Sequence, residues 1–134
     1  MISIQFGFIG IDSGQLGNNS YDSSLVPVAV DTSGVLDGLT MKAITAGWGF
    51  TCSIASDNLA YCWGSNYAGQ LGQINGPYDT SAPLVVDTSV PVSYGSIGNM
   101  RGKTFKSIDS GEFVTCVIAS DNHVYCWANF SGGL

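Results

Sequence analysis

The four cysteines are the residues of this chain whose type and spacing point most directly to a chemical role. Nine residues separate Cys52 from Cys62, and nine separate Cys116 from Cys126. With a Ser-Asp-Asn turn inside each pair, the two cysteines stand opposite each other in an antiparallel hairpin, within reach of a disulfide. We therefore predict the disulfides Cys52–Cys62 and Cys116–Cys126. Free buried thiols are one alternative, and a four-cysteine metal site is another that fits poorly, because zinc sites use close pairs such as Cys-x2-Cys.

The remaining polar residues do not form a catalytic set. His123 is the only histidine, so the chain offers neither a histidine pair for a metal nor a Ser-His-Asp arrangement. Asp57 and Asp121 lie at expected turn centres, where aspartate is favoured for backbone reasons, and we expect Asp31 and Asp87 to be turn or cap residues for the same reason. These observations predict a protein that is not an enzyme and holds no cofactor or metal.

The charge balance excludes several classes of partner. The chain has 134 residues, ten acidic and four basic side chains, and a net charge of −6. Nucleic acids and anionic membrane surfaces are bound mainly through clustered Lys and Arg, which are scarce here. The sequence also lacks the run of about 20 apolar residues that a membrane-spanning helix requires. We expect no nucleic-acid and no membrane partner.

Two copies of one motif lie 64 residues apart. Residues 42–63 have the sequence KAITAGWGFTCSIASDNLAYCW, and residues 106–127 have KSIDSGEFVTCVIASDNHVYCW. A second shared element, Gly-Gln-Leu-Gly, occurs at 14–17 and at 69–72, and a Pro-containing segment ending in Val-Asp-Thr-Ser follows each copy. Such tandem repeats are typical of supersecondary units that bury their apolar faces by stacking on one another.

Each repeat is predicted to contain four short strands and no helix, which is the pattern of a propeller blade. The fold class we expect is all-β, a β-propeller fragment of about two four-stranded antiparallel blades plus a leading strand, in a single repeat domain. The expected strands are 25–30, 42–46, 51–55 and 59–64 in the first unit, and 83–87, 105–109, 115–119 and 123–128 in the second. Blade one would occupy 13–64 and blade two 68–128, with 2–12 as the last strand of an incomplete blade and 129–134 as the start of a next repeat.

Two places could contact a protein partner. Trp48 and Glu112 occupy the glycine turns of the two repeats, and such turns lie at the rim of a propeller. The second repeat also carries an insertion of nine residues around 90–104, which we expect on a surface loop. This region holds Tyr94, Met100, Arg101 and Lys103, and an aromatic residue together with arginine is a composition common at binding hot spots. The alternative interpretation of the glycine turns is that their sequence is simply variable. The alternative for the insertion is a solvated loop whose charges serve solubility.

These motifs resemble the repeats of the regulator of chromosome condensation family, over about residues 13–134. The resemblance rests on Gly-Gln-Leu-Gly, the Pro-bearing segment, and Tyr61-Cys62-Trp63-Gly64 with its second copy Tyr125-Cys126-Trp127-Ala128. Phe50 and Val114 stand where the family usually has histidine. The resemblance implies a propeller fold whose full ring normally has seven blades, and the cysteine-bearing variant is similar to that of secreted bacterial proteins.

Taken together, the repeats and the missing catalytic set predict a non-enzymatic protein-binding scaffold. It would be a fragment of a longer propeller or a subunit that assembles with copies of itself into a ring. The alternatives are a guanine-nucleotide exchange or chromatin-type regulator, as the family name suggests, and a secreted enzyme inhibitor. Disulfides predict an extracellular or periplasmic location, although residues 1–11 lack the basic residues and cleavage site of a signal peptide.

Overall fold

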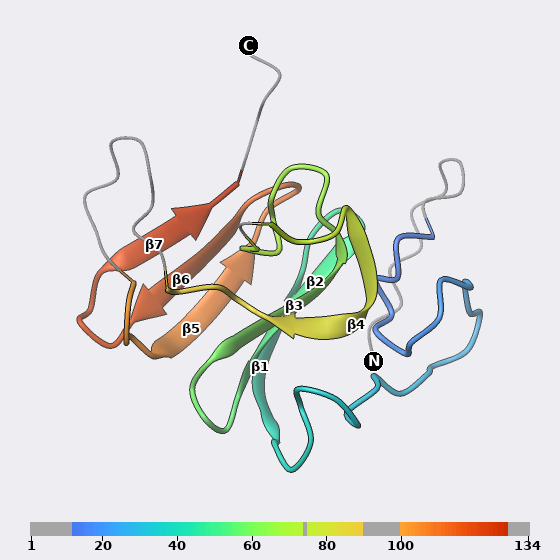
Figure 1. Cartoon of the computed structure of the whole chain (residues 1–134), viewed down its shortest axis with the longest axis horizontal. Helices are drawn as coiled ribbons and strands as arrows, with labels where there is room; N and C mark the ends of the chain where they lie inside the picture. Colours follow the sequence, from blue (N-terminus) through green and yellow to red (C-terminus); the bar gives the residue numbers. More distant parts are fainter. Residues whose placement is uncertain (1–11, 74, 90–99, 129–134) are drawn as a thin grey trace.

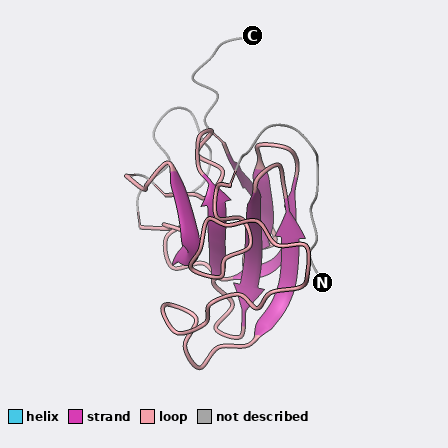
Figure 2. Ribbon diagram, turned by 90° about the vertical axis from the view of Figure 1, so that its right-hand side faces the viewer, coloured by secondary structure: helices cyan, strands magenta, loops and turns pink. Residues whose placement is uncertain are grey.

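The chain folds into two antiparallel β-sheets that lie face to face (Figures 1 and 2). The computed structural model describes residues 12–73, 75–89 and 100–128. Sheet one has the order β1-β2-β3-β4, and sheet two has the order β5-β6-β7. The strands are β1 (Met41–Ala46), β2 (Phe50–Ala55), β3 (Ala60–Ser65), β4 (Asp79–Val85), β5 (Phe105–Ser110), β6 (Thr115–Ala119) and β7 (Val124–Trp127). The described residues contain no helix, so the expected all-β class is confirmed.

The central hairpin of each sheet has the register that the cysteine spacing predicts. Cys52 pairs with Cys62 across β2 and β3, and Cys116 pairs with Cys126 across β6 and β7. Both pairs are disulfide-bonded, and no described cysteine is free. The two disulfides are therefore confirmed, and the free-thiol and metal alternatives are excluded for these cysteines in this structure.

The turns of these hairpins are built alike. Asn58 and Asn122 adopt left-handed backbone conformations, with φ of 63° and 65°, which asparagine tolerates better than most residues. One residue earlier, Asp57 accepts a hydrogen bond from the Leu59 amide at 3.0 Å, and Asp121 accepts the equivalent bond from His123 at 3.1 Å. The two acids thus have the turn role that the sequence indicated.

The main core lies between the two sheets. One face of sheet one presents Cys52, Ile54 and Cys62 to a face of sheet two that carries Phe105 and Val117, and all five are almost fully buried. Strand β5 is the strand of sheet two that lies against β1 and β2. The opposite face of sheet one buries Tyr61 and Trp63 beneath Leu36 of the segment that precedes β1.

Each Gly-Gln-Leu-Gly element ties the loop that carries it to one sheet. The Gln15 carbonyl accepts hydrogen bonds from Trp63 Nε1 and Thr51 Oγ1, both at 3.0 Å. The Gln70 carbonyl accepts the equivalent bonds from Trp127 Nε1 and Thr115 Oγ1, both at 2.9 Å. The last position of the element has no room for a side chain, since a Cβ on Gly17 would lie 2.5 Å from the Trp63 ring nitrogen. The loop between β3 and β4 therefore leaves sheet one, contacts sheet two and returns.

Two strand assignments from the sequence were wrong. Residues 25–30 form no strand, whereas the segment expected at 83–87 forms β4 at 79–85 and pairs with β3 of sheet one. The sequence repeat and the sheet are therefore offset, because β4 follows the Gly-Gln-Leu-Gly loop of the next repeat. Pro83 is compatible with β4 because this strand is at the edge of sheet one and needs no second ladder. The segments expected at 2–12 and 129–134 lie almost entirely outside the described residues.

Candidate protein-interaction site

The glycine turns of the two repeats come together at one end of the sheets. The Trp48 amide donates a hydrogen bond to the Glu112 carbonyl at 3.0 Å. The Trp48 ring meets Phe113 edge to face, with ring centroids 5.3 Å apart and planes at 83°, a favourable aromatic arrangement. At the base of this contact, a Cβ on Gly47 would lie 2.5 Å from the Gly111 carbonyl oxygen. The structure thus brings together Trp48 and Glu112, which the sequence placed in equivalent turns of the two repeats.

These turns form one wall of a pocket, which we call the aromatic pocket. It has a volume of about 280 Å³, and its lining residues are Ser13, Trp48, Ser65, Tyr67, Tyr78, Asp79 and Phe113. Trp48 is 44% exposed, and Tyr67 and Tyr78 are 80% and 78% exposed. Large aromatic side chains left open to solvent are the typical anchors of a protein interface.

Asn66 holds the far wall of the aromatic pocket in place. Its amide donates to the Tyr78 carbonyl at 2.5 Å, and its side-chain Nδ2 donates to the Pro77 carbonyl at 3.0 Å. Its Oδ1 accepts the Leu71 amide at 3.1 Å. Asn66 therefore connects the two tyrosine-bearing ends of the β3–β4 loop to the Gly-Gln-Leu-Gly element.

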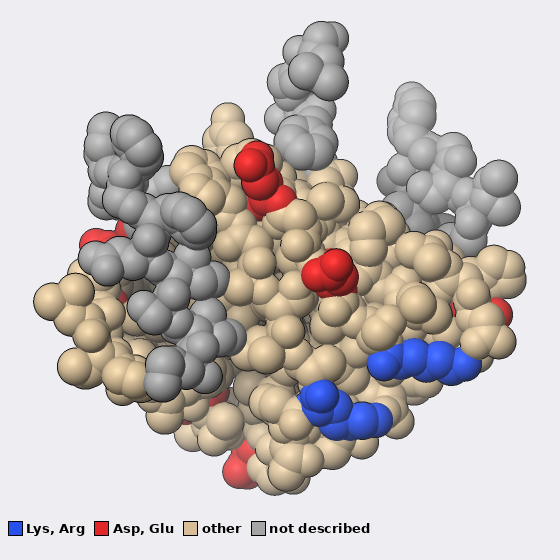
Figure 3. Space-filling view, turned by 180° about the vertical axis from the view of Figure 1, so that it is seen from behind, with Lys and Arg blue, Asp and Glu red and all other residues tan. Residues whose placement is uncertain are grey.

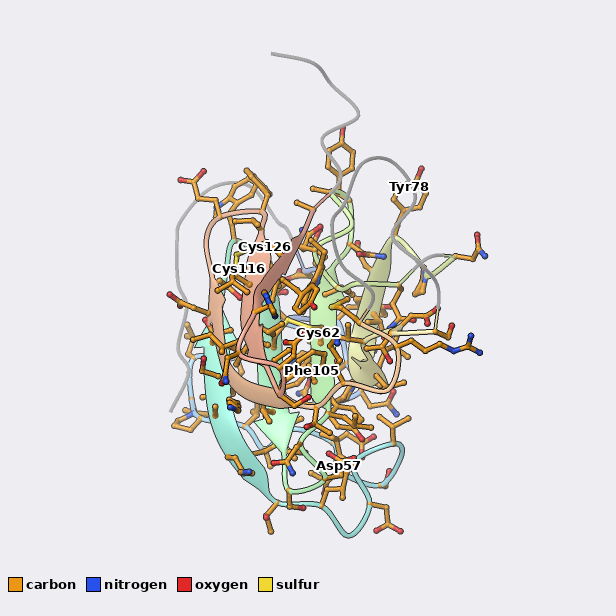
Figure 4. The ribbon with its side chains drawn as sticks, turned by 90° about the vertical axis from the view of Figure 1, so that its left-hand side faces the viewer. Asp57, Cys62, Tyr78, Phe105, Cys116 and Cys126 are labelled. Atoms are coloured by element: carbon orange, nitrogen blue, oxygen red, sulfur yellow. A yellow bond between two sulfur atoms is a disulfide. The ribbon has the colours of Figure 1, made fainter. Side chains whose placement is uncertain are left out.

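The two ends of the sheets differ in charge. We call the end with the turns at 47–49 and 111–113 the aromatic rim, and the end with the turns at 56–59 and 120–123 the asparagine rim. Lys42 and Lys106 donate to Asn58 and Asn122, and Lys103 is paired with Asp121 at 2.9 Å. Figure 4 shows Tyr78 and Asp57 at opposite ends, and Figure 3 shows the visible basic side chains in the lower half of the molecule.

One acid and two tyrosines of the asparagine rim have shifted pKa values with local causes. A hydrogen bond from Lys103 holds the pKa of Asp121 well below its usual value, and the Tyr125 hydroxyl donates to the same carboxylate at 2.8 Å. Asp121 in turn raises the pKa of Tyr125. In the first repeat, burial and the Asp57 hydrogen bond raise the pKa of Tyr61 to about 12. These groups brace turns, and their shifted pKa values follow from that structural role.

The second predicted contact region has a different role from the one we expected. Met100 is only 9% exposed and packs in the core between the sheets, so its assignment to a binding surface was wrong. It occupies the position that Leu36 has in the first repeat, which is also buried at 1%. Lys103 is engaged by Asp121, Arg101 is exposed, and Tyr94 lies outside the described residues.

Neither a metal centre nor a membrane helix appears in the described part of the chain. There, no group of three or more His, Cys, Asp or Glu side chains could hold a metal ion, and none of its segments forms an apolar helix of membrane-spanning length. The His123 ring is 75% exposed and faces Asp121 of its own turn at 3.3 Å.

Sequence reasoning missed the other walls of the aromatic pocket. Tyr67 and Tyr78 flank the second Gly-Gln-Leu-Gly element, and Phe113 directly follows Glu112. A usable signal was present, because aromatic residues beside the repeated turns of a predicted rim are candidates for contact for the same reason as Trp48.

Comparison with known proteins supports the repeat assignment. The regulator of chromosome condensation (RCC1) repeat profile matches residues 41–70. The human WBSCR16 structure matches with a TM-score of 0.68 and 19% sequence identity, over 89% of this chain and 26% of that chain. Prp20p from Saccharomyces cerevisiae matches with a TM-score of 0.51 and 19% identity, over 69% of this chain and 21% of that chain. The chain thus spans about a quarter of these proteins or less, and the likeness establishes a shared fold.

Proposed function

We propose that this chain, which carries an RCC1 repeat and has the fold of RCC1 propeller blades, is a non-enzymatic scaffold that binds a protein partner. The observation that carries the proposal is the aromatic rim, where turns of both repeats and the β3–β4 loop combine into one open aromatic pocket. Rigid sheets that present loops of this kind are suited to recognition.

A peptide-display selection would test this function. The purified chain is used as bait, and the enriched clones are re-tested on Trp48→Ala and on Leu25→Ala, a control that alters a side chain 91% exposed and outside the pocket. We expect enriched clones that keep binding Leu25→Ala and lose at least about tenfold in affinity on Trp48→Ala, in line with the loss of an aromatic hot spot. Clones that bind both variants equally would remove the aromatic rim from the proposal.

The exchange-factor and inhibitor alternatives differ in the partner they require. The printed title of the Prp20p structure names binding to Gsp1p and histones, which is a property of that protein. Histones are basic, and this chain has a net charge of −6, so a basic protein partner is electrostatically compatible. A secreted enzyme inhibitor would use the same rim on a different target, and the sequences of selected peptides would separate the two.

We further propose that the chain works in an oxidising compartment, outside the cell or in a periplasm. Each repeat carries a disulfide on its central hairpin, and such bonds persist mainly where glutathione and thioredoxin do not reduce them. Alkylation of the protein in freshly lysed source cells or culture medium tests this. We expect no reactive thiol after denaturation, whereas four thiols would place the protein in a reducing compartment.

Self-association is a second proposal, supported by apolar side chains that are exposed on the outer faces of the two sheets. Ile118 is 41% exposed although its counterpart Ile54 is 1% exposed, and Val124 is 63% exposed although Ala60 is 1% exposed. On sheet one, Met41 is 40% exposed although its counterpart Phe105 is 2% exposed. Within the chain, the inner face of sheet one packs on the inner face of sheet two. The outer face of each sheet carries the counterparts of the residues on the other sheet's inner face, so the two outer faces are complementary in the same way.

A head-to-tail contact between copies would stack the outer face of sheet two on the outer face of sheet one, beside Met41 and the segment around Leu36. Such contacts are heterologous and close into rings or extend as filaments. Light scattering across a concentration series should show association that Val124→Lys abolishes and Leu25→Lys, a control at a 91% exposed loop residue, leaves intact. A monomer at every concentration would overturn the assembly proposal without affecting the aromatic rim.

A further inference from the structure

We propose that the aromatic pocket binds a cationic side chain, an arginine or a lysine, presented by the protein partner. The inference rests on the protein-binding function proposed above and names the chemical group that the pocket accepts. It follows from three features of the site: aromatic walls, one carboxylate at the lining, and the segregation of the chain's basic residues to the other rim.

Aromatic rings make up most of the pocket wall. Trp48, Tyr67, Tyr78 and Phe113 all line it, and they come from three different segments of the chain. A cation held within about 6 Å of an aromatic ring face is attracted by the negative face of the ring, most strongly by tryptophan and tyrosine. The edge-to-face contact with Phe113 limits the orientations of the Trp48 ring, so this wall is already in place before a ligand arrives.

Asp79 supplies the charge that an aromatic wall alone lacks. It is the first residue of β4, it pairs with Ser65 at the end of β3, and the Tyr21 hydroxyl lies 3.5 Å from its carbonyl. Its backbone is therefore held at the pocket lining by the sheet. The ion pairs of the described residues join Asp121 to Lys103 and to His123 and do not involve Asp79, so its carboxylate is available to a cation from outside.

The distribution of charge over the whole chain favours the same ligand. All four basic residues, Lys42, Arg101, Lys103 and Lys106, belong to the described residues and lie near the asparagine rim, next to the first residues of β1 and β5. The aromatic rim carries Asp79 and Glu112 without a compensating base. A rim of one charge sign steers and retains ligands of the opposite sign.

The size of the pocket argues for a side chain and against a larger cofactor. Its volume of about 280 Å³ lies just below the range of about 300–1,000 Å³ that is usual for small-molecule sites. Two tyrosines that are nearly four-fifths exposed form an open mouth, through which the end of a side chain on a folded partner can enter. The pocket therefore suits a guanidinium or an ammonium group on a flexible stem.

The three tryptophans allow a direct test by nuclear magnetic resonance. The indole N–H groups of Trp63 and Trp127 are bonded to Gln15 and Gln70 and serve as internal references, whereas Trp48 lines the pocket. The protein is titrated with four Gly-Ser peptides that differ in one central residue: arginine, lysine, citrulline or glutamate. Citrulline has nearly the shape of arginine and no charge.

We expect the arginine and lysine peptides to shift the Trp48 indole signal saturably while the two reference signals stay in place. The citrulline peptide should bind at least about fivefold more weakly, and raised salt should weaken the arginine peptide, since exposed charges are screened. Asp79→Asn should reduce arginine binding about fivefold or more. Asp37→Asn, which removes the same charge from an exposed loop residue, should change it by less than about twofold.

Two results would overturn the inference. If citrulline binds as well as arginine and Asp79→Asn has no effect, the pocket accepts a neutral group, and peptides from the display selection would still test the protein-binding function. If the cationic peptides leave the Trp48 signal unmoved, the pocket is not a cation site. If the Trp63 and Trp127 signals lose their native positions in Asp79→Asn, that variant has misfolded. Cationic peptide binding is then measured on Tyr67→Ala, which alters an 80% exposed side chain.

Discussion

The hairpin of β2 and β3 and the hairpin of β6 and β7 share a register and a disulfide position, yet they lie in different surroundings. Cys52 and Cys62 are fully buried, whereas Cys126 is exposed. The first hairpin is covered on both faces, by sheet two and by the segment around Leu36. The comparison separates hairpin formation from hairpin stabilisation. The local sequence determines the hairpin, and the neighbouring layers determine how strongly it is stabilised.

The largest difference is expected at the two tryptophans that bond to the Gly-Gln-Leu-Gly carbonyls. Trp63 is 1% exposed, while Trp127 is only partly buried. Trp63→Ala should lower the free energy of unfolding by about 3–5 kcal/mol, and Trp127→Ala by less than about 3 kcal/mol, because a smaller cavity forms there. Urea unfolding under non-reducing conditions measures both. Equal losses of unfolding free energy would mean that each tryptophan stabilises the fold mainly through its hydrogen bond to the Gly-Gln-Leu-Gly carbonyl and not through its burial.

The isoleucines of β2 and β6 test the same comparison without a hydrogen bond. Ile54 is 1% exposed and Ile118 is 41% exposed. Ile54→Ala should cost about 2–5 kcal/mol of folding stability, and Ile118→Ala less than about 1 kcal/mol for a dilute monomer. If Ile118→Ala is as damaging as Ile54→Ala, then β6 has a cover in solution, and repeating the measurement over a range of protein concentrations would reveal self-association.

The features that the sequence predicted well are those decided within a few residues. The nine-residue spacing and the Ser-Asp-Asn turn were sufficient to pair Cys52 with Cys62, because a two-strand register follows from the turn. The strands of the two central hairpins were likewise placed to within one residue at most ends. Alternating β-branched and aromatic residues between turn residues carry that information locally.

The features that the sequence did not predict depend on contacts between distant segments. Strand β4 has the same Pro-containing pattern as residues 25–30, but only β4 has a described partner strand, β3, on which to form a ladder. Met100 carried a surface interpretation because it lies beside an insertion, although its alignment with Leu36 across 64 residues already indicated a core position. The aromatic pocket gathers residues from four segments, which no single stretch of sequence reveals.

The two disulfides should also differ in their rates of reduction. Both close loops of the same length, with a separation of 10 residues, so the chain-entropy model assigns each the same stabilisation, about 2.7 kcal/mol. Reduction rates should differ, because a thiol reductant reaches the exposed Cys126 more easily than the buried Cys62. Mass spectrometry after brief dithiothreitol treatment and alkylation should find Cys116 and Cys126 modified first. Simultaneous modification of all four would show that both bonds open only on global unfolding.

The smallest expected effect concerns a lysine contact that the second repeat has and the first lacks. Lys103 pairs with Asp121, whereas the equivalent position beside Asp57 is Leu39. Because the pKa of Asp121 is lowered from 3.8 when folded, chiefly by Lys103, the ionised acid favours the folded state above about pH 4, and this contribution is lost as the pH falls through the folded pKa. Carboxyl-detected NMR should show the Asp121 midpoint rising towards 3.8 in Lys103→Ala, with part of the shift kept by the Tyr125 hydroxyl. An unchanged midpoint would assign the lowered pKa to the hydrogen bonds of the turn itself, which both repeats share.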